Sequence, residues 1–250
     1  MPAKRIIAAL DVINNSVVKG INFENIKNVD NPVELAKRYE MEGIDEIVFL
    51  DITATNEKRN ILKNLVKNVA SEIYIPFTAG GGINSVENAL DIIRNGADKI
   101  FINTYAIENP AIVRKLSDVL GSANTVVAID AKYENNNYYV YSHGGKINTG
   151  KNVIEWAKNV DDYGAGEVLI TSINSDGTMK GYDNNLIELL SNKINIPVIA
   201  SGGAGKPEDF LNAFKSGADG ALAASVFHYK KYSVKEIKNY LKENGINVRL

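Results

Sequence analysis

Two aspartates stand in this sequence where acid–base chemistry can be carried out. Asp11 ends the apolar run AALD and Asp130 ends the run VAID, so each carboxyl group follows a predicted buried strand. A single aspartate at the end of a strand is often a helix cap or a loop ligand. Two of them in similar settings can supply a general acid and a general base. We therefore predict that Asp11 and Asp130 are the catalytic pair.

Two glycine clusters predict phosphate sites. Gly80-Gly81-Gly82 and Gly202-Gly203 each follow an apolar run and precede a helical segment. Glycine lets backbone N–H groups approach a phosphate closely, and the positive end of the next helix favours negative charge. Asn103-Thr104 and Ala224-Ser225 follow the next apolar runs and add N–H and hydroxyl donors. One glycine run alone would be an ordinary turn, but the same context occurs twice, which predicts two phosphates on one elongated substrate.

The elements that must position these residues are short apolar runs that alternate with amphipathic segments. Helix-start signals lie between the runs, among them Asn31-Pro32, Ser85 before Glu87, and the Ser233 to Glu236 capping box. Strands that alternate with helices predict a parallel sheet. The eight runs are Arg5 to Leu10, Glu46 to Leu50, Pro76 to Ala79, Lys99 to Ile102, Val126 to Ile129, Glu167 to Ile170, Val198 to Ala200 and Ala218 to Ala223.

An internal repeat favours a closed barrel over an open sheet. The segments IPFTAGGGINSVENALDIIRNGADKI and IPVIASGGAGKPEDFLNAFKSGADGA align without a gap, and Pro76 and Pro197 are 121 residues apart (197 − 76). Thr104 and Ser225 keep the same offset (225 − 104 = 121). Two four-stranded halves make a closed ring of eight strands. We predict an α/β fold, a single (β/α)8 TIM-barrel domain over 1–250, with similar half-barrels at about 1–122 and 123–250, and chemistry at the C-terminal ends of the strands.

The composition limits the class of partner. The chain has 250 residues, 45% of them hydrophobic, and a net charge of −2, so we expect one large core and a small-molecule substrate rather than nucleic acid or a membrane. There is no cysteine, and His143 and His228 lack partners at ligand spacing, so we predict no metal and no cofactor. The start MPAKRIIAALDV is neither a signal sequence nor a membrane span, so we expect a cytoplasmic protein.

Two connections are longer than the others, and each follows one of the two aspartates. Residues 12–31 carry Lys19-Gly20 and could close over a ligand as a lid. Residues 133–150 contain the alternating stretch Tyr138 to Tyr141, which predicts a β-hairpin; covering the barrel rim is an equal alternative role. Asp176-Gly177 follows the sixth run, where contact with substrate and an ordinary turn are equally good interpretations.

Stretches along nearly the whole chain then indicate a family. The sequence resembles the cyclase subunits of imidazole glycerol phosphate synthase, which act in histidine biosynthesis. The resemblance implies a reaction of ammonia with a bisphosphorylated ribulosyl aminoimidazole-carboxamide ribonucleotide, giving imidazole glycerol phosphate and an aminoimidazole carboxamide ribotide. The matching stretches are KRIIAALDV, VVKGINFENI, DEIVFLDITAT, TAGGGI, GADKIFINT, VVAIDAK, INTG, GAGEVLITS, DGTMKGYD, IASGGAG and LAASVFH.

The resemblance also implies roles for individual residues. It makes Asp11 and Asp130 the general acid and base, and it places Lys19 in a closing first loop. Asp51 and Thr171 match polar positions near the barrel mouth. The residues implied at one phosphate are Gly82, Asn103 and Thr104, and those around the other are Asp176, Gly177, Gly203, Ala224 and Ser225.

At the other end of the barrel, the resemblance implies a route for ammonia. A separate glutaminase subunit docks there in this family, and ammonia passes a charged gate that corresponds to Arg5, Glu46, Lys99 and Glu167. The residues alone predict paired charges that plug a barrel end, which is compatible with a gate. Asp98 matches a position at the glutaminase interface.

The chain departs from the family pattern at a few positions. Phe101 stands where the family usually has a small residue, and strand alternation turns it into the barrel with Lys99 and Asn103. Its ring would narrow the ammonia route, although Ala9, where cysteine is usual, leaves room. Asn174-Ser175 replaces the usual Asp-Arg pair before Asp176. Alternative functions are the sister isomerase of the same pathway, an amidotransferase relative with another substrate, and a non-catalytic phosphate-binding barrel.

Overall fold

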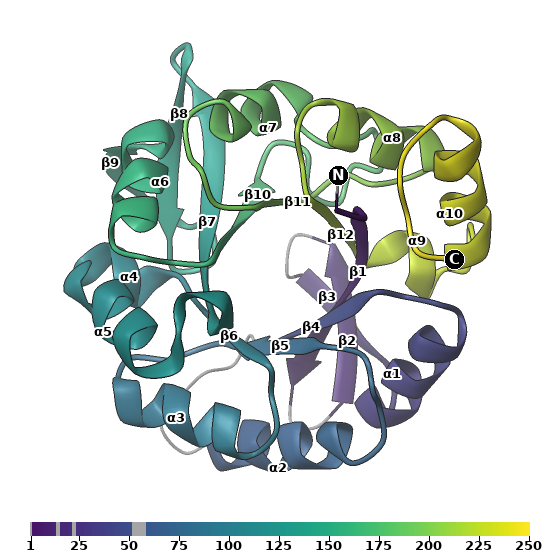
Figure 1. Cartoon of the computed structure of the whole chain (residues 1–250), viewed down its shortest axis with the longest axis horizontal. Coiled ribbons are helices and arrows are strands. Elements are labelled where there is room, and N and C mark those ends of the chain that lie inside the picture. The colour runs from purple at the N-terminus through teal and green to yellow at the C-terminus, as the bar shows by residue number, and fades with distance from the viewer. Residues whose placement is uncertain (1, 14–15, 22–23, 52–58) are drawn as a thin grey trace.

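Parallel strands close into a ring at the centre of the protein, and helices surround it (Figure 1). The computed structural model describes residues 2–13, 16–21, 24–51 and 59–250, and it describes side chains outside 13–30 and 52–62. Within these residues the ring has eight strands, each hydrogen-bonded to two neighbours, because β10 pairs with both β11 and β7. In ring order they are β1 (Arg5–Ile13), β4 (Glu46–Asp51), β5 (Phe77–Gly80), β6 (Lys99–Ile102), β7 (Thr125–Glu134), β10 (Glu167–Ser172), β11 (Val198–Ser201) and β12 (Gly220–Ala223). The predicted (β/α)8 barrel is confirmed.

The helices begin where the sequence has capping signals. The Asn31 side chain accepts a hydrogen bond from the Val33 N–H at the start of α1, and Ser85 caps α3 in the same way. Ser233 and Glu236 form the capping box of α10. The helices are α1 (Pro32–Met41), α2 (Arg59–Ala70), α3 (Val86–Arg94), α4 (Thr104–Glu108), α5 (Ala111–Leu120), α6 (Val153–Asp162), α7 (Asn184–Ser191), α8 (Pro207–Lys215), α9 (Ser225–His228) and α10 (Val234–Glu243), with a 3-10 turn η2 (Ser122–Asn124).

The internal repeat reappears in the bounds of the elements. Both ends of β4, β5, α3 and β6 return 121 residues later as both ends of β10, β11, α8 and β12; α3 and α8, for example, begin at 86 and 207 (207 − 86 = 121). The short helices α4 and α9 begin at the equivalent residues Thr104 and Ser225. The two halves therefore present equivalent loops at the same end of the barrel.

Alternation along the strands fills the barrel interior in layers. One buried cluster consists of side chains that point into the ring and includes Ile7, Val48 and Phe101. A separate and larger cluster lies between the strands and the helices, where Phe49 and Phe77 meet edge to face. Arg5, Glu46 and Lys99 precede Ile7, Val48 and Phe101 by two positions and lie at the N-terminal end of the barrel, whereas Asn103, two positions after Phe101, lies at the mouth.

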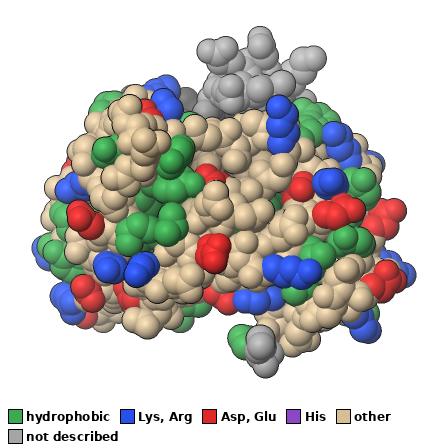
Figure 2. All heavy atoms as spheres, turned by 90° about the horizontal axis from the view of Figure 1, so that it is seen from above, with side chains coloured by type: hydrophobic (Ala, Val, Ile, Leu, Met, Phe, Trp, Pro, Cys, Tyr) green, Lys and Arg blue, Asp and Glu red, His purple; other side chains and the backbone are tan. Residues whose placement is uncertain are grey.

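Both long connections contain paired strands. The hairpin predicted after Asp130 is present, because β7 pairs antiparallel with β8 (Asn137–Ser142), and β8 pairs with β9 (Ile147–Asn152). The first connection contains β2 (Ser16–Ile21) and β3 (Glu24–Asp30), an antiparallel pair joined to β1. On the outer face seen in Figure 2, acidic and basic side chains are interspersed rather than separated into patches of one sign.

Candidate active site

Asp11 and Asp130 lie on opposite sides of the barrel. Asp11 is in β1 and Asp130 is in β7, and in ring order three strands separate them on either side: β4, β5 and β6 one way, β10, β11 and β12 the other. Both belong to the interior set by alternation, Asp11 following Ile7 and Ala9, and Asp130 following Ala128. Both side chains are half-buried. Two carboxyl groups therefore face the same space at the C-terminal end of the barrel.

Asp130 has a specific polar environment. The Asn103 Nδ2 group donates a hydrogen bond of 3.0 Å to Asp130 Oδ2. Burial raises the pKa of Asp130 from 3.8 to about 6; the bond from Asn103 works against this rise, and the nearby Asp176 carboxylate adds to it. In the sheet, Asp130 lies beside Thr171 of β10 and Tyr141 of β8. A carboxyl group with this pKa can accept and release a proton near neutral pH.

The glycine loops lie across the mouth from each other, since β5 and β11 are opposite in the ring. Gly81 and Gly203 have φ values of +118° and +106°, a backbone conformation that residues other than glycine rarely adopt. A Cβ atom on Gly203 would collide with the Gly181 carbonyl, and one on Gly81 with the Asp51 carbonyl. Both loops thus bring bare backbone to the mouth, each just before a nine-residue helix, α3 or α8.

The predicted donors after β6 and β12 begin the short helices. Thr104 and Ser225 are the first residues of α4 and α9, and Asn103 and Ala224 precede them. The Thr104 hydroxyl oxygen accepts a 2.9 Å hydrogen bond from the His143 N–H, which fixes the end of β8 against this site. Since β6 and β12 are opposite strands, the donors form one group on each side of the mouth.

The remaining predicted mouth residues occupy different settings. Thr171 shares the interior face of β10 with Leu169, whereas Asp51 alternates with Leu50, so it faces away from the interior at the end of β4. Asp176 and Gly177 are exposed in the turn after β10, where the Asp176 N–H donates to the Ser172 carbonyl. Lys19 is in β2, and its side chain lies outside the described residues.

Four charged side chains form a closed ring at the N-terminal end of the barrel. Arg5 bridges Glu46 and Glu167 at 2.8 Å each. Lys99 bridges the same two carboxylates at 3.2 Å and 3.1 Å. Burial opposes the charge of Arg5, but the two glutamates outweigh it, so the pKa of Arg5 is raised. The two positive and two negative groups alternate and close this end of the interior.

Thr78 belongs to this ring and was not predicted from the sequence. It is buried in β5, beside Lys99 in the sheet register, and its hydroxyl donates a 2.8 Å hydrogen bond to Glu46 Oε1. The signal that could have revealed it is a lone hydroxyl in the otherwise apolar run PFTAG. With this bond, a fifth strand side chain supports the ring.

Asp98 lies on the same N-terminal face. Its Oδ2 accepts a hydrogen bond from the Phe77 N–H, just as the equivalent Asp219 accepts one from Val198. Asp219 also pairs with Lys4 at 2.8 Å, while the described side chains show no ion pair for Asp98, which is exposed. Asp98 therefore combines a role within the barrel with a carboxylate directed to the surface.

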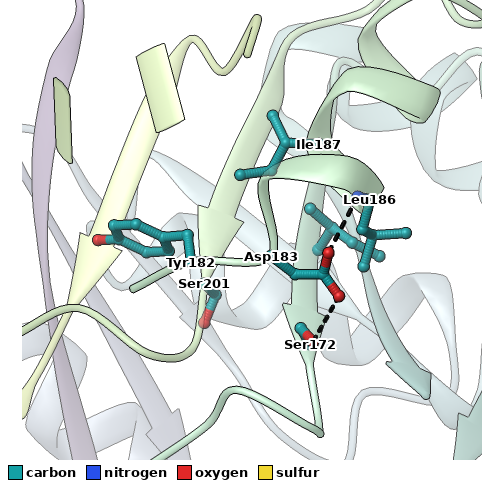
Figure 3. A pocket seen from close by; sticks show the side chains of 7 residues that line it. Ser172, Tyr182, Asp183, Leu186, Ile187 and Ser201 are labelled. Atoms are coloured by element: carbon teal, nitrogen blue, oxygen red, sulfur yellow. Dashed lines mark hydrogen bonds between the residues drawn. The ribbon is translucent and has the colours of Figure 1, made fainter. Parts of the chain in front are cut away.

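A second residue that was not predicted, Asp183, joins β8, β10 and the start of α7. Figure 3 shows its carboxylate between Ser172 and the N-terminus of α7, in a pocket that Tyr182 and Ser201 also line. It accepts hydrogen bonds from the Ser172 hydroxyl (3.1 Å), the Leu186 N–H (3.1 Å) and the Tyr138 hydroxyl (3.0 Å). An aspartate just before a helix is a cap signal that could have revealed it.

The described residues hold no cluster of metal ligands and no membrane-spanning helix. No group of three or more histidine, aspartate or glutamate side chains in this part of the chain could hold a metal ion. Likewise, no helix among these residues is long and apolar enough to cross a membrane.

Comparison with known proteins gives a consistent match. The family model described as histidine biosynthesis protein matches residues 5–233. The imidazole glycerol phosphate synthase subunit HisF of Pyrococcus furiosus is 60% identical over 250 residues, covering 100% of both chains. The HisF subunit of Thermococcus onnurineus is 60% identical, covering 100% of this chain and 99% of its own. That of Sulfolobus acidocaldarius is 55% identical, covering 100% of both chains.

Proposed function

This chain belongs to the histidine biosynthesis protein family, with the HisF subunits of imidazole glycerol phosphate synthase, and we propose that Asp11 and Asp130 carry out its cyclase reaction. The substrates are ammonia and a bisphosphorylated ribulosyl aminoimidazole-carboxamide ribonucleotide. The products are imidazole glycerol phosphate and aminoimidazole carboxamide ribotide. The observation that supports the roles of the two aspartates is their position on opposite strands, each next to one group of mouth donors.

The reaction needs groups that give and take protons. Ammonia adds to a carbonyl carbon, and a carbon–nitrogen bond is broken when the ribotide leaves; both steps move protons between oxygen and nitrogen atoms. Two carboxyl groups on opposite sides of one substrate can serve as acid and base in turn. The raised pKa of Asp130, about 6 because of burial, suits a group that exchanges a proton near neutral pH.

The two phosphates of the substrate fit the two glycine loops. We assign one phosphate to Gly82 and Thr104, and the other to Gly203 and Ser225. Backbone N–H groups and hydroxyls suit phosphate oxygens, and α3 and α8 point their positive ends toward these loops. Because the loops are opposite each other across the mouth, a substrate bound at both would pass between Asp11 and Asp130. We place Lys19, Thr171, Ala224, Asp176 and Gly177 around this substrate as further binding residues. Asp51 supports the first glycine loop instead, since its backbone carbonyl lies against Gly81.

Ammonia reaches the mouth from the N-terminal end in this proposal. A glutaminase subunit docks on the face that carries Asp98, and ammonia enters past Arg5, Glu46, Lys99 and Glu167. Separating two of these ion pairs would open the ring to a small neutral molecule. The ring supports this function over the sister isomerase, which needs no ammonia and hence no entry at this end.

The test is turnover of the bisphosphorylated ribotide with ammonium as the nitrogen source, without a glutaminase. We expect substrate loss and release of the carboxamide ribotide. Asp11→Asn and Asp130→Asn should each lower the turnover number by orders of magnitude, because each removes a proton-transfer group. The exposed Asp118→Asn is the control and should keep wild-type turnover. Near-normal rates in either active-site variant would refute the role of that residue, and isomerisation without cleavage would indicate the sister enzyme.

A further inference from the structure

The Asn103 side chain contacts Asp130 directly, whereas the resemblance to the cyclase subunits places Asn103 at a phosphate site. Its position just before α4 would let it cap that helix or reach an anion bound there. Within the described residues its side chain makes no capping bond to α4. The amide turns to the next strand instead and donates to Asp130 Oδ2 at 3.0 Å. One of the two N–H donors of this amide is thus engaged by the Asp130 carboxyl group.

The other end of the same amide is also informative. Asn103 Oδ1 is buried and has no hydrogen-bond partner among the described residues. A buried acceptor without a partner costs free energy, so such an atom in a native protein calls for an explanation. When Asp130 takes up a proton, its carboxyl group gains an O–H donor, and Asn103 Oδ1 is an adjacent acceptor that no other described group uses.

These observations rest on the role of Asp130 proposed above and extend it to a second residue. We propose that Asn103 is a positioning residue that holds the Asp130 carboxyl group in both its ionised and its protonated form, and that its side chain is not a phosphate ligand. In the ionised form the amide N–H donates to the carboxylate. In the protonated form the carboxyl O–H donates to the amide oxygen as well.

The internal repeat does not carry the Asn103 side chain into the second half of the barrel. The residue equivalent to Asn103 is Ala224 (103 + 121 = 224), which precedes α9 beside β1 and Asp11. Alanine has no polar side chain, so it cannot hold a carboxyl group in this way. The two carboxyl groups therefore differ in the support that they receive from the preceding strand, although the loops around them are equivalent.

Other charged or titratable groups also lie near Asp130. Asp176, after β10, is the charged group that adds to the raised pKa of Asp130. Tyr141, opposite Asp130 in β8, gives its hydroxyl to Glu134. Lys132, two residues along β7, pairs with Glu134 and lies over the Tyr141 ring. A variant at Asn103 leaves all of these groups in place.

The test measures kcat and KM against pH with ammonium as nitrogen source. Asn103→Leu keeps a similar volume and removes both hydrogen-bonding atoms. We expect kcat to fall at least tenfold and KM to stay within about threefold, because the Asp130 carboxyl group loses its hydrogen-bond partner in both of its forms while the phosphate loops are unchanged. Asn103→Asp should move the acid limb of the kcat/KM profile to higher pH, since it adds a second carboxylate next to Asp130. A kcat within about threefold of wild type in Asn103→Leu, or an unmoved limb in Asn103→Asp, would overturn the proposal.

A binding measurement in an inactive background separates the two roles of Asn103 directly. In Asp130→Asn the new amide can keep both hydrogen bonds with Asn103, and substrate affinity can be measured by calorimetry without turnover. Adding Asn103→Leu to this variant should leave the Kd for the bisphosphorylated ribotide within about threefold. A tenfold or larger loss of affinity would show a phosphate ligand and overturn the proposal. If Asp130→Asn itself turns over normally, the catalytic role of Asp130 fails first, which the same series of variants detects.

Discussion

At the scale of single residues, the buried Asp130 carboxyl group makes the stability of the folded protein depend on pH. Its pKa is raised from 3.8 to about 6, chiefly by burial, so the folded protein binds this proton more tightly than the unfolded chain does. The free energy of unfolding therefore decreases as the pH rises from about 4 to about 6. Below about pH 4 the Asp130 carboxyl group is protonated in both the folded and the unfolded state, so this loss of stability is absent.

This linkage predicts a pH-dependent effect of Asp130→Asn. The amide stays neutral, so the variant should gain about 1 to 3 kcal/mol relative to wild type between pH 4.5 and pH 7.5, for a shift of about two pKa units at about 1.4 kcal/mol each. Denaturant unfolding at a series of pH values measures the difference. The exposed Asp118→Asn should show no such trend. A difference between Asp130→Asn and wild type that does not change with pH would contradict the prediction.

The sequence identified residue types at the mouth better than it identified their contacts. Asp11 and Asp130 could be found because each ends an apolar run, and the position of a strand end is visible in the sequence. The bond from Asn103 to Asp130 could not be found, because it joins side chains of neighbouring strands 27 residues apart in the chain. The same holds for Asp183, whose three partners come from β8, β10 and α7.

At the scale of elements, the period of the strands was predictable and their lengths were not. The run Lys99 to Ile102 matches β6 at both ends, whereas β12 begins at Gly220 rather than at Ala218. The Ala218 N–H bonds back to Ala213 at the end of α8, so helix termination competes with strand formation there. The sequence predicts residues 12–31 as a lid and does not predict the strands β2 and β3 within them. Their pairing with each other and with β1 depends on contacts that hydropathy alone does not show.

Strands β5 and β6 together fill the interior just above the charged ring. The Phe101 ring is buried against Gly80, where a Cβ atom would collide with it. In the other half the equivalent positions hold Leu222 and Ser201, so one half has a large side chain beside a glycine. If ammonia travels through this interior, the Phe101 ring lies on its route.

We therefore predict that Phe101→Ala raises the ratio of glutamine-dependent to free-ammonium turnover, because it widens the route without touching the mouth. The ratio is measured with the glutaminase subunit present and saturating. Phe77→Ala is the matched control: it removes an equally buried ring from the same pair of strands, but from the cluster outside the barrel. Both variants should be less stable by about 3 to 5 kcal/mol. An unchanged ratio in Phe101→Ala, or an equal rise in Phe77→Ala, would contradict the prediction.

At the scale of the whole molecule, the two ends of the barrel differ in how closely the two halves repeat each other. The mouth carries equivalent donor loops from both halves, as expected for a substrate with two phosphates. The N-terminal end is not equivalent between halves: Glu46 and Glu167 correspond, but Lys99 corresponds to Gly220 (99 + 121 = 220). The repeat thus explains the mouth, while the charged ring depends on residues that only one half supplies, as a single entry point for ammonia would require.

The N-terminal face also carries large exposed side chains. Tyr74 lies just before β5 and is 95% exposed, and Met41 ends α1 and is 81% exposed. Both are on the same end of the barrel as the exposed Asp98. Tyrosine is enriched at interface hot spots, and methionine is enriched at interfaces. We expect Met41, Tyr74 and Asp98 to contact the glutaminase subunit.

Tyr74→Ala should therefore weaken binding of the glutaminase subunit by about tenfold or more, which corresponds to about 1.4 kcal/mol or more. The fold should be unaffected, because the Tyr74 backbone N–H keeps its bond to Glu40 and the ring makes little contact with the barrel. Calorimetric titration measures the affinity, and free-ammonium turnover should stay at the wild-type value. Leu189→Ala, at an exposed position of α7 in the outer helical layer, is the control and should bind normally. Wild-type affinity in Tyr74→Ala would place the docking surface elsewhere, and a fall in ammonium turnover would show that Tyr74 supports the barrel instead.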